Sequence, residues 1–202
     1  MITIYHAPRT RSIRVIWLCE ELGLEYEVVD VDFSVAYRAS PAWRQMHPAG
    51  KVPVMRDGDL QMFESGAMVQ YLLDRYGQGR LMPVTGSHEH ALFLQWCWFA
   101  EATFARPLGE IVNHRRAFTE AQQSAAAIDE MQARARLCMD TLEQALADRP
   151  YLLGEEFSAA DIMTGYSLML AEWLLPTPFS PQLADYWQRL CARPAYQAAA
   201  QR

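Results

Sequence analysis

The feature that most constrains the fold is the pattern of the first 31 residues. Residues 2–5 (Ile-Thr-Ile-Tyr) alternate apolar and polar side chains, as a half-buried strand does. From Ile13 to Leu22 apolar side chains recur at helical spacing, and Gly23 follows at the position where a helix end favours glycine. Residues 26–31 predict a second strand. A strand, a helix and a strand within about 30 residues form a βαβ unit with parallel strands.

A second group of elements follows this unit. The segment 32–50 is expected to be irregular, because Pro41 and Pro48 prevent a long helix. Residues 52–55 and 60–63 predict two strands joined by a tight turn, since an Asp-Gly pair between them is typical of a hairpin.

A helix is expected after the hairpin, beginning at Glu64 and Ser65 and closed by Gly77. The order β-α-β, connection, β-β-α is the thioredoxin-like layout. We therefore assign residues 1–79 to a thioredoxin-like domain.

The remainder predicts helices only. Glycine and proline residues punctuate a linker after Gly77, and no convincing strand lies beyond it. The fold class is thus α/β plus all-α, with an all-helical C-terminal domain over residues 86–202. Its expected helices cover residues 88–114, 119–147, 158–175, 182–192 and 194–201.

Composition excludes several classes of protein. The net charge of −6 argues against a broad nucleic-acid-binding surface. The chain starts without the basic and apolar stretches of a signal peptide, and no apolar run is long enough to span a bilayer, so we expect a soluble, cytoplasmic protein. The cysteines form no CxxC pair, which argues against a disulfide scaffold, a metal site or a dithiol centre. They are Cys19, Cys97, Cys138 and Cys191.

Four segments, in order and at characteristic spacing, resemble the cytosolic glutathione transferase family over essentially the whole chain. They are the first helix Ser12–Gly23, the Lys51-Val-Pro-Val54 stretch, the Glu64-Ser65 helix start, and the Ser158-Ala-Ala-Asp161 capping box. The loop before the first helix contains hydroxyl side chains and no cysteine, so the chain resembles bacterial members of the serine or threonine type rather than the cysteine type.

The resemblance implies a site for glutathione, used as a co-substrate without a metal. Glu64 would bind the γ-glutamyl ammonium group, and Ser65 would bind the γ-glutamyl carboxylate at a helix N-terminus. A cis Val52–Pro53 bond would present the main chain of Val52 to the cysteinyl part of glutathione. Lys51, the only lysine, would pair with the glycyl carboxylate.

The group that activates the thiol lies, in this family, between the first strand and the first helix. Thr10 stands where several classes hold a catalytic serine, and Ser12 is the competitor, although it could instead cap the helix. Tyr5 would suit a tyrosine-type enzyme, although its place in the strand pattern favours packing. A hydroxyl donor would stabilise the thiolate by hydrogen bonding.

The electrophile is expected beside the first helix of the second domain. Phe104 and Arg106 are the predicted pocket residues, whereas Trp96 and Phe99 are expected in the core. The implied activity is conjugation of glutathione to small, largely apolar electrophiles by a homodimer. The alternatives are a non-catalytic binding or regulatory member of the fold, and a glutathione-dependent peroxidase or isomerase.

Overall fold

The computed structural model describes residues 1–202 and divides into two compact units. The first contains Met1–Arg80 together with Ala192–Arg202, and the second contains Leu81–Cys191. Residues 192–202, which the sequence pattern assigned to the helical domain 86–202, are grouped with the first unit in the structure. Local periodicity predicts a helix but does not show against which elements that helix packs.

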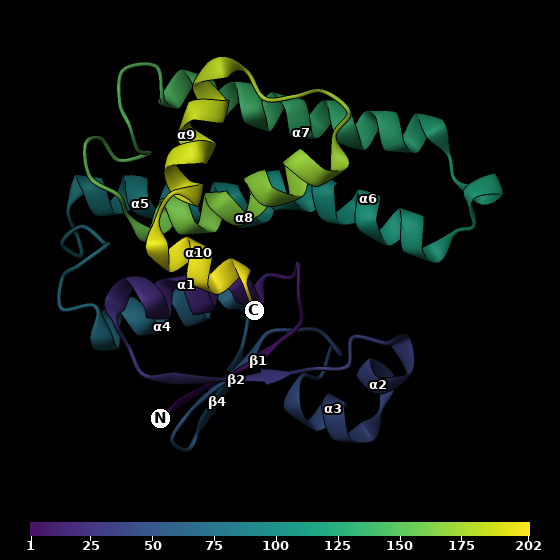
Figure 1. Cartoon of the computed structure of the whole chain (residues 1–202), viewed down its shortest axis with the longest axis horizontal. Coiled ribbons are helices and arrows are strands. Elements are labelled where there is room, and N and C mark those ends of the chain that lie inside the picture. The colour runs from purple at the N-terminus through teal and green to yellow at the C-terminus, as the bar shows by residue number, and fades with distance from the viewer. The chain divides into compact units, whose positions relative to one another are not determined.

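The first unit is built on a four-stranded sheet (Figure 1). Its strands are β1 (Ile2–His6), β2 (Tyr26–Asp30), β3 (Val54–Asp57) and β4 (Leu60–Phe63), in the order β2-β1-β3-β4. β1 and β2 are parallel, whereas β3 is antiparallel to both β1 and β4. The predicted thioredoxin-like arrangement is confirmed.

Three helices of this unit lie on one side of the sheet: α1 (Ser12–Leu22), α4 (Ser65–Tyr76) and α10 (Pro194–Ala200). The ring of Trp17 on α1 makes an edge contact with Tyr196 on α10, with a centroid distance of 4.8 Å. Next to it, Arg193 donates to both carboxylate oxygens of Glu21 at 2.6 and 2.7 Å. These contacts hold the last helix of the chain against the first.

The other side of the sheet carries a second small core. The indole of Trp43 is buried against Ala7, Val31, Val52 and Val54. It comes from α3 (Pro41–Met46), which follows the short α2 (Val35–Ala39). The hydroxyl groups of Ser34 and Ser40 cap the two helices. The segment expected to be irregular therefore contains two short helices. Pro41 is compatible with the second helix because it stands at that helix's N-terminus.

The second unit is helical. Residues 88–114, expected as one helix, form two helices separated by the π-helical turn Phe99–Phe104. The most buried helix of this unit is α8 (Ala159–Leu174), which opens with the predicted capping box: the main-chain N–H of Ser158 donates to the Asp161 carboxylate at 2.8 Å. The α-helices of this unit are α5 (His88–Trp98), α6 (Ala105–Ala117), α7 (Ala125–Ala145), α8 (Ala159–Leu174) and α9 (Pro181–Cys191), with a 3₁₀ turn at Glu120–Gln122.

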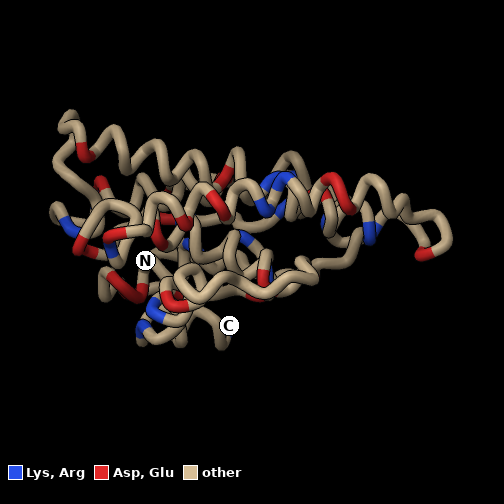
Figure 2. Tube along the Cα trace, turned by 90° about the horizontal axis from the view of Figure 1, so that it is seen from above, with Lys and Arg blue, Asp and Glu red and all other residues tan.

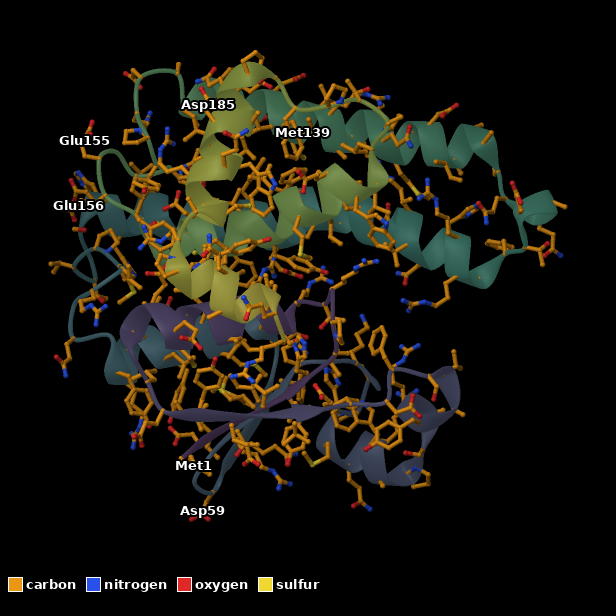
Figure 3. All side chains as sticks on the ribbon, in the orientation of Figure 1. Met1, Asp59, Met139, Glu155, Glu156 and Asp185 are labelled. Atoms are coloured by element: carbon orange, nitrogen blue, oxygen red, sulfur yellow. The ribbon has the colours of Figure 1, made fainter.

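Charged positions are spread along both units, and acidic and basic residues alternate rather than forming a continuous basic face (Figure 2). No helix is long and apolar enough to cross a membrane. In Figure 3, Met1 and Asp59 lie at the end of the sheet where β1 begins and the β3–β4 hairpin turns. The segments predicted to bind glutathione adjoin the strands at the opposite end of the sheet.

Candidate functional site

The strand register brings the three predicted glutathione-binding segments to one end of the sheet. Tyr5, near the end of β1, pairs with Val54 at the start of β3, and Val54 pairs with Phe63 at the end of β4. The loop that follows β1, the stretch that precedes β3 and the start of α4 therefore share this end. A site here can contact a ligand from three separate parts of the chain.

The loop after β1 holds a chain of hydrogen-bonded polar side chains. The Ser12 Oγ lies 2.7 Å from His6 Nδ1 and 2.7 Å from Thr10 Oγ1. Thr10 Oγ1 also lies 2.7 Å from the Ala7 carbonyl oxygen. Thr10 is partly exposed, whereas Ser12 and His6 are buried. Of the two candidate hydroxyl groups, that of Thr10 is therefore the accessible one.

Ser12 does not cap α1, contrary to the expectation for that residue. The N-cap is Arg11, whose backbone is already helical, with φ −58° and ψ −13°, and no side chain caps the first turn. Because the helix begins one residue earlier than expected, the Ser12 hydroxyl faces His6 instead of the helix end. Tyr5 packs against Trp43, with ring centroids 6.1 Å apart, which fits the packing role expected for it.

The second segment is the stretch before β3. The Val52–Pro53 peptide bond is cis, as the resemblance implied. Val52 and Pro53 are buried and Lys51 beside them is exposed. Close to this stretch in sequence, the His47 ring lies 4.8 Å from that of Phe63 and accepts the Ala49 N–H. Burial lowers the pKa of His47, which favours the neutral imidazole.

The third segment is the start of α4. Glu64 is the N-cap and has φ 78° and ψ 102°, a backbone conformation that residues other than glycine rarely adopt. Its side chain is exposed, whereas Ser65 is buried. Strained backbone of this kind costs about 1–3 kcal/mol and concentrates at binding sites. The helix N-terminus beside it offers unpaired N–H groups to an anion.

Arg14 is the residue of this region that sequence reasoning missed. Its side chain is fully buried on α1, and its Nη1 donates to Ser65 Oγ at 3.3 Å. The available signal was its position among the apolar side chains that recur at helical spacing from Ile13 to Leu22. A buried guanidinium beside the start of α4 adds positive charge where an anion would bind.

The two electrophile-pocket residues differ in exposure. Phe104 is fully buried, with its ring centroid 6.4 Å from that of Phe99, and its assignment to a pocket wall stays a prediction. Phe104 is the last residue of the π-helical turn. Arg106 is exposed and forms an ion pair with Glu110 at 3.1 Å. Trp96 is buried as expected, whereas Phe99 is only partly buried.

None of the cysteines stands in the loop after β1. Burial raises the pKa of Cys19 to about 12 and that of Cys138 to about 11, so both stay protonated at neutral pH. None of the four cysteines forms a disulfide. No group of three or more His, Cys, Asp or Glu side chains that could hold a metal ion is brought together.

Comparison with known proteins identifies the class to which this fold and this site belong. The family model of the glutathione S-transferase N-terminal domain matches residues 1–74, and that of the C-terminal domain matches residues 125–189. A theta class glutathione S-transferase from Xanthomonas axonopodis pv. citri, solved with glutathione bound, is 31% identical, with a TM-score of 0.84 over 100% of this chain and 97% of the other. The chain belongs to the glutathione S-transferase family of enzymes.

Other relatives extend the comparison. A probable glutathione S-transferase from Oryza sativa is 29% identical over 94% of this chain and 90% of its own. The disulfide-bond oxidoreductase YfcG from Escherichia coli is 27% identical over 96% of this chain and 92% of its own length. A glutathione transferase from Phanerochaete chrysosporium, solved with oxidized glutathione, has a TM-score of 0.89 and 25% identity. The match covers 99% of this chain and 94% of the other.

Proposed function

We propose that this protein binds glutathione at the end of the sheet defined above, stabilises its thiol as a thiolate and transfers it to small, largely apolar electrophiles. The observation that carries the proposal is the register of β1, β3 and β4, which gathers the three segments at one end of the sheet. Family membership supports the same reading.

In this proposal each polar group of glutathione has a partner of complementary chemistry. The exposed carboxylate of Glu64 takes the γ-glutamyl ammonium group, and the N-terminus of α4 with Ser65 takes the γ-glutamyl carboxylate. Arg14 strengthens that anion site through its bond to Ser65. The main chain of Val52, beside Pro53, pairs with the cysteinyl residue, and Lys51 pairs with the glycyl carboxylate.

The thiol is activated by a hydroxyl group in the loop after β1. Thr10 and Ser12 are the candidates, since both hydroxyl oxygens lie in the same hydrogen-bonded cluster. Lowering the pKa of a thiol by two units needs about 2.7 kcal/mol. A hydrogen bond to a charged group contributes about 1.5–3 kcal/mol, so one hydroxyl donor supplies most of this stabilisation.

The electrophile is expected at the second unit, where Arg106 on α6 offers an exposed guanidinium to a polar substituent. We further propose that the protein acts in the cytoplasm as a homodimer. The four cysteines form no disulfide, as is usual for proteins of a reducing compartment.

A second candidate function is glutathione-dependent disulfide reduction. It is favoured by the similarity to a disulfide-bond oxidoreductase and by the neighbour that holds oxidized glutathione. Disulfide reduction would use the same glutathione site. The glutathione thiolate attacks a disulfide sulfur, forms a mixed disulfide and releases a thiolate. A second glutathione then releases the other thiol and forms glutathione disulfide.

Binding and turnover test the proposal separately. Calorimetry with glutathione should show binding that the double variant Glu64→Ala, Ser65→Ala loses, while Ser167→Ala, which removes a buried hydroxyl from the second unit, leaves it unchanged. Chlorodinitrobenzene as electrophile and hydroxyethyl disulfide as oxidant then distinguish conjugation from disulfide reduction. Unchanged affinity in the double variant would contradict the site, and no binding by the parent protein would favour a non-catalytic role.

A further inference from the structure

His6, Ser12 and Thr10 form an unbroken line of hydrogen-bonding atoms from the interior of the first unit to a partly exposed hydroxyl. Its steps are His6 Nδ1 to Ser12 Oγ at 2.7 Å and Ser12 Oγ to Thr10 Oγ1 at 2.7 Å. His6 is 2% exposed and Ser12 is fully buried, so bulk water does not reach the inner part of the line. Thr10 is its outer end.

The hydrogen bond at the inner end of the line determines which ring nitrogen of His6 carries the proton. His6 Nε2 lies 3.1 Å from the main-chain oxygen of Arg202, which can only accept a hydrogen bond. Neutral His6 therefore carries its proton on Nε2, and its Nδ1 accepts one from the Ser12 hydroxyl. The charged groups acting on the ring are Asp30 at the end of β2 and Arg202 after α10, with opposite effects, and burial favours the neutral form.

The outer end can pass its own proton inward. The proton of Ser12 is donated to His6, so a lone pair of Ser12 Oγ is left for the Thr10 hydroxyl. Thr10 shares its one proton between Ser12 Oγ and the Ala7 carbonyl oxygen, both 2.7 Å away. With His6 neutral, every bond of the line can thus point from Thr10 towards His6, which is the direction needed to carry a proton inward.

We infer that His6 is the acceptor of the glutathione thiol proton, relayed by the hydroxyl groups of Thr10 and Ser12. The inference rests on the proposed function and assigns the contact with sulfur to Thr10. The S–H bond breaks and its electron pair stays on sulfur. The thiol proton passes to Thr10 Oγ1, the Thr10 proton to Ser12 Oγ, and the Ser12 proton to His6 Nδ1.

The arrangement after transfer is also fully hydrogen-bonded. The imidazolium of His6 donates from Nε2 to Arg202 and from Nδ1 to Ser12, Ser12 donates to Thr10, and Thr10 donates to the thiolate. The negative sulfur raises the proton affinity of the imidazole, because an opposite charge favours the charged form and offsets burial. Thr10 therefore touches the reacting atom, whereas Ser12 and His6 act through it.

The balance of protons distinguishes this relay from release of the proton to solvent. Thiolate formation is read from its ultraviolet absorbance in the complex with glutathione. Proton release is read by calorimetry in buffers of different ionisation enthalpy, with S-methylglutathione, which has no ionisable thiol, as reference. We expect the parent protein to release far less than one proton for each thiolate formed near neutral pH.

Variants test each link of the relay. In His6→Asn the amide oxygen can still accept from Ser12 but cannot take up a proton. We expect it either to release about one proton per thiolate or to bind glutathione with a thiol pKa raised by about one unit or more. Ser12→Ala should behave in the same way. Thr10→Val should lose the thiolate, and Thr10→Ser, which keeps the hydroxyl group, should restore it. Ser167→Ala, which lies outside the relay, should match the parent. Thermal unfolding checks that each variant is folded.

The failures of the two proposals look different. If S-methylglutathione does not bind to the parent protein, the proposed function itself fails, and the relay with it. If glutathione binds as a thiolate and one proton per thiolate enters the buffer, the proposed function stands and the relay is wrong. A parent protein that binds glutathione only as the neutral thiol also overturns the relay.

Discussion

Arg14 and Ser65 are joined by a hydrogen bond between two buried side chains from different helices, the Nη1 of Arg14 donating to the Ser65 hydroxyl at 3.3 Å. A guanidinium keeps its charge even when buried, so this bond places a fixed positive charge at the first residue of α4. The helix dipole adds positive potential at the same point. Both effects favour a carboxylate there.

Replacing Arg14 by glutamine should therefore weaken binding of glutathione about tenfold or more, because a charged donor is replaced by a neutral one. An analogue that lacks the γ-glutamyl carboxylate provides the control. The parent protein and Arg14→Gln should bind that analogue with equal affinity in calorimetry. An equal loss for both ligands would mean that the substitution acts on the fold rather than on the carboxylate.

Glu64 combines an exposed carboxylate with a strained backbone, since its φ is 78°. Glu64→Gly should be about 1 kcal/mol more stable to urea than Glu64→Ala, because only glycine adopts this conformation without strain. Both variants should lose binding of glutathione, because both lack the carboxylate. Equal stability of the two variants would show that the backbone conformation is relaxed when the side chain is removed.

The sequence predicted those parts of the site that depend on local chemistry. The helix start at Ser65 was predicted from the residue pattern and is confirmed, and the cis Val52–Pro53 bond, which only the family resemblance implied, is also present. Features that depend on packing between elements were missed. The burial of Arg14 depends on the elements that pack around α1, and the π-helical turn Phe99–Phe104 interrupts a helix that periodicity alone predicts as continuous. The link from His6 to Arg202 joins opposite ends of the chain.

Asp161 does more than close the capping box that the sequence predicted. Its buried carboxylate accepts from the Leu152 N–H at 3.0 Å and from the Tyr186 hydroxyl at 2.7 Å, besides two bonds from Ser158. Asp161→Ala leaves several buried donors without partners, so it should lower the free energy of unfolding by roughly 2–5 kcal/mol, more than a lost cap alone.

The control for Asp161 is Ser158→Ala, which removes one hydroxyl and should cost about 0.5–2 kcal/mol in the same urea titration. Neither variant should change the thiol pKa of bound glutathione while the protein stays folded. A stability loss in Asp161→Ala no larger than that in Ser158→Ala would argue against the wider network.

The ionised carboxylate of Asp57 should stabilise the first unit at neutral pH and lose this effect at acid pH. This residue of β3 accepts from the hydroxyl groups of Tyr71 and Tyr76 on α4, and these bonds, the stronger from Tyr76, hold the pKa of the carboxyl below its ordinary value. A group with a lowered pKa in the folded state stabilises the fold above its unfolded pKa, about 3.9, and loses that contribution as pH falls through the folded pKa. The difference in urea stability between the parent and Asp57→Asn should therefore be largest near neutral pH and shrink below about pH 4. If the difference in urea stability stays constant across this range, the ionised form of Asp57 does not stabilise the contact between the β3–β4 hairpin and α4.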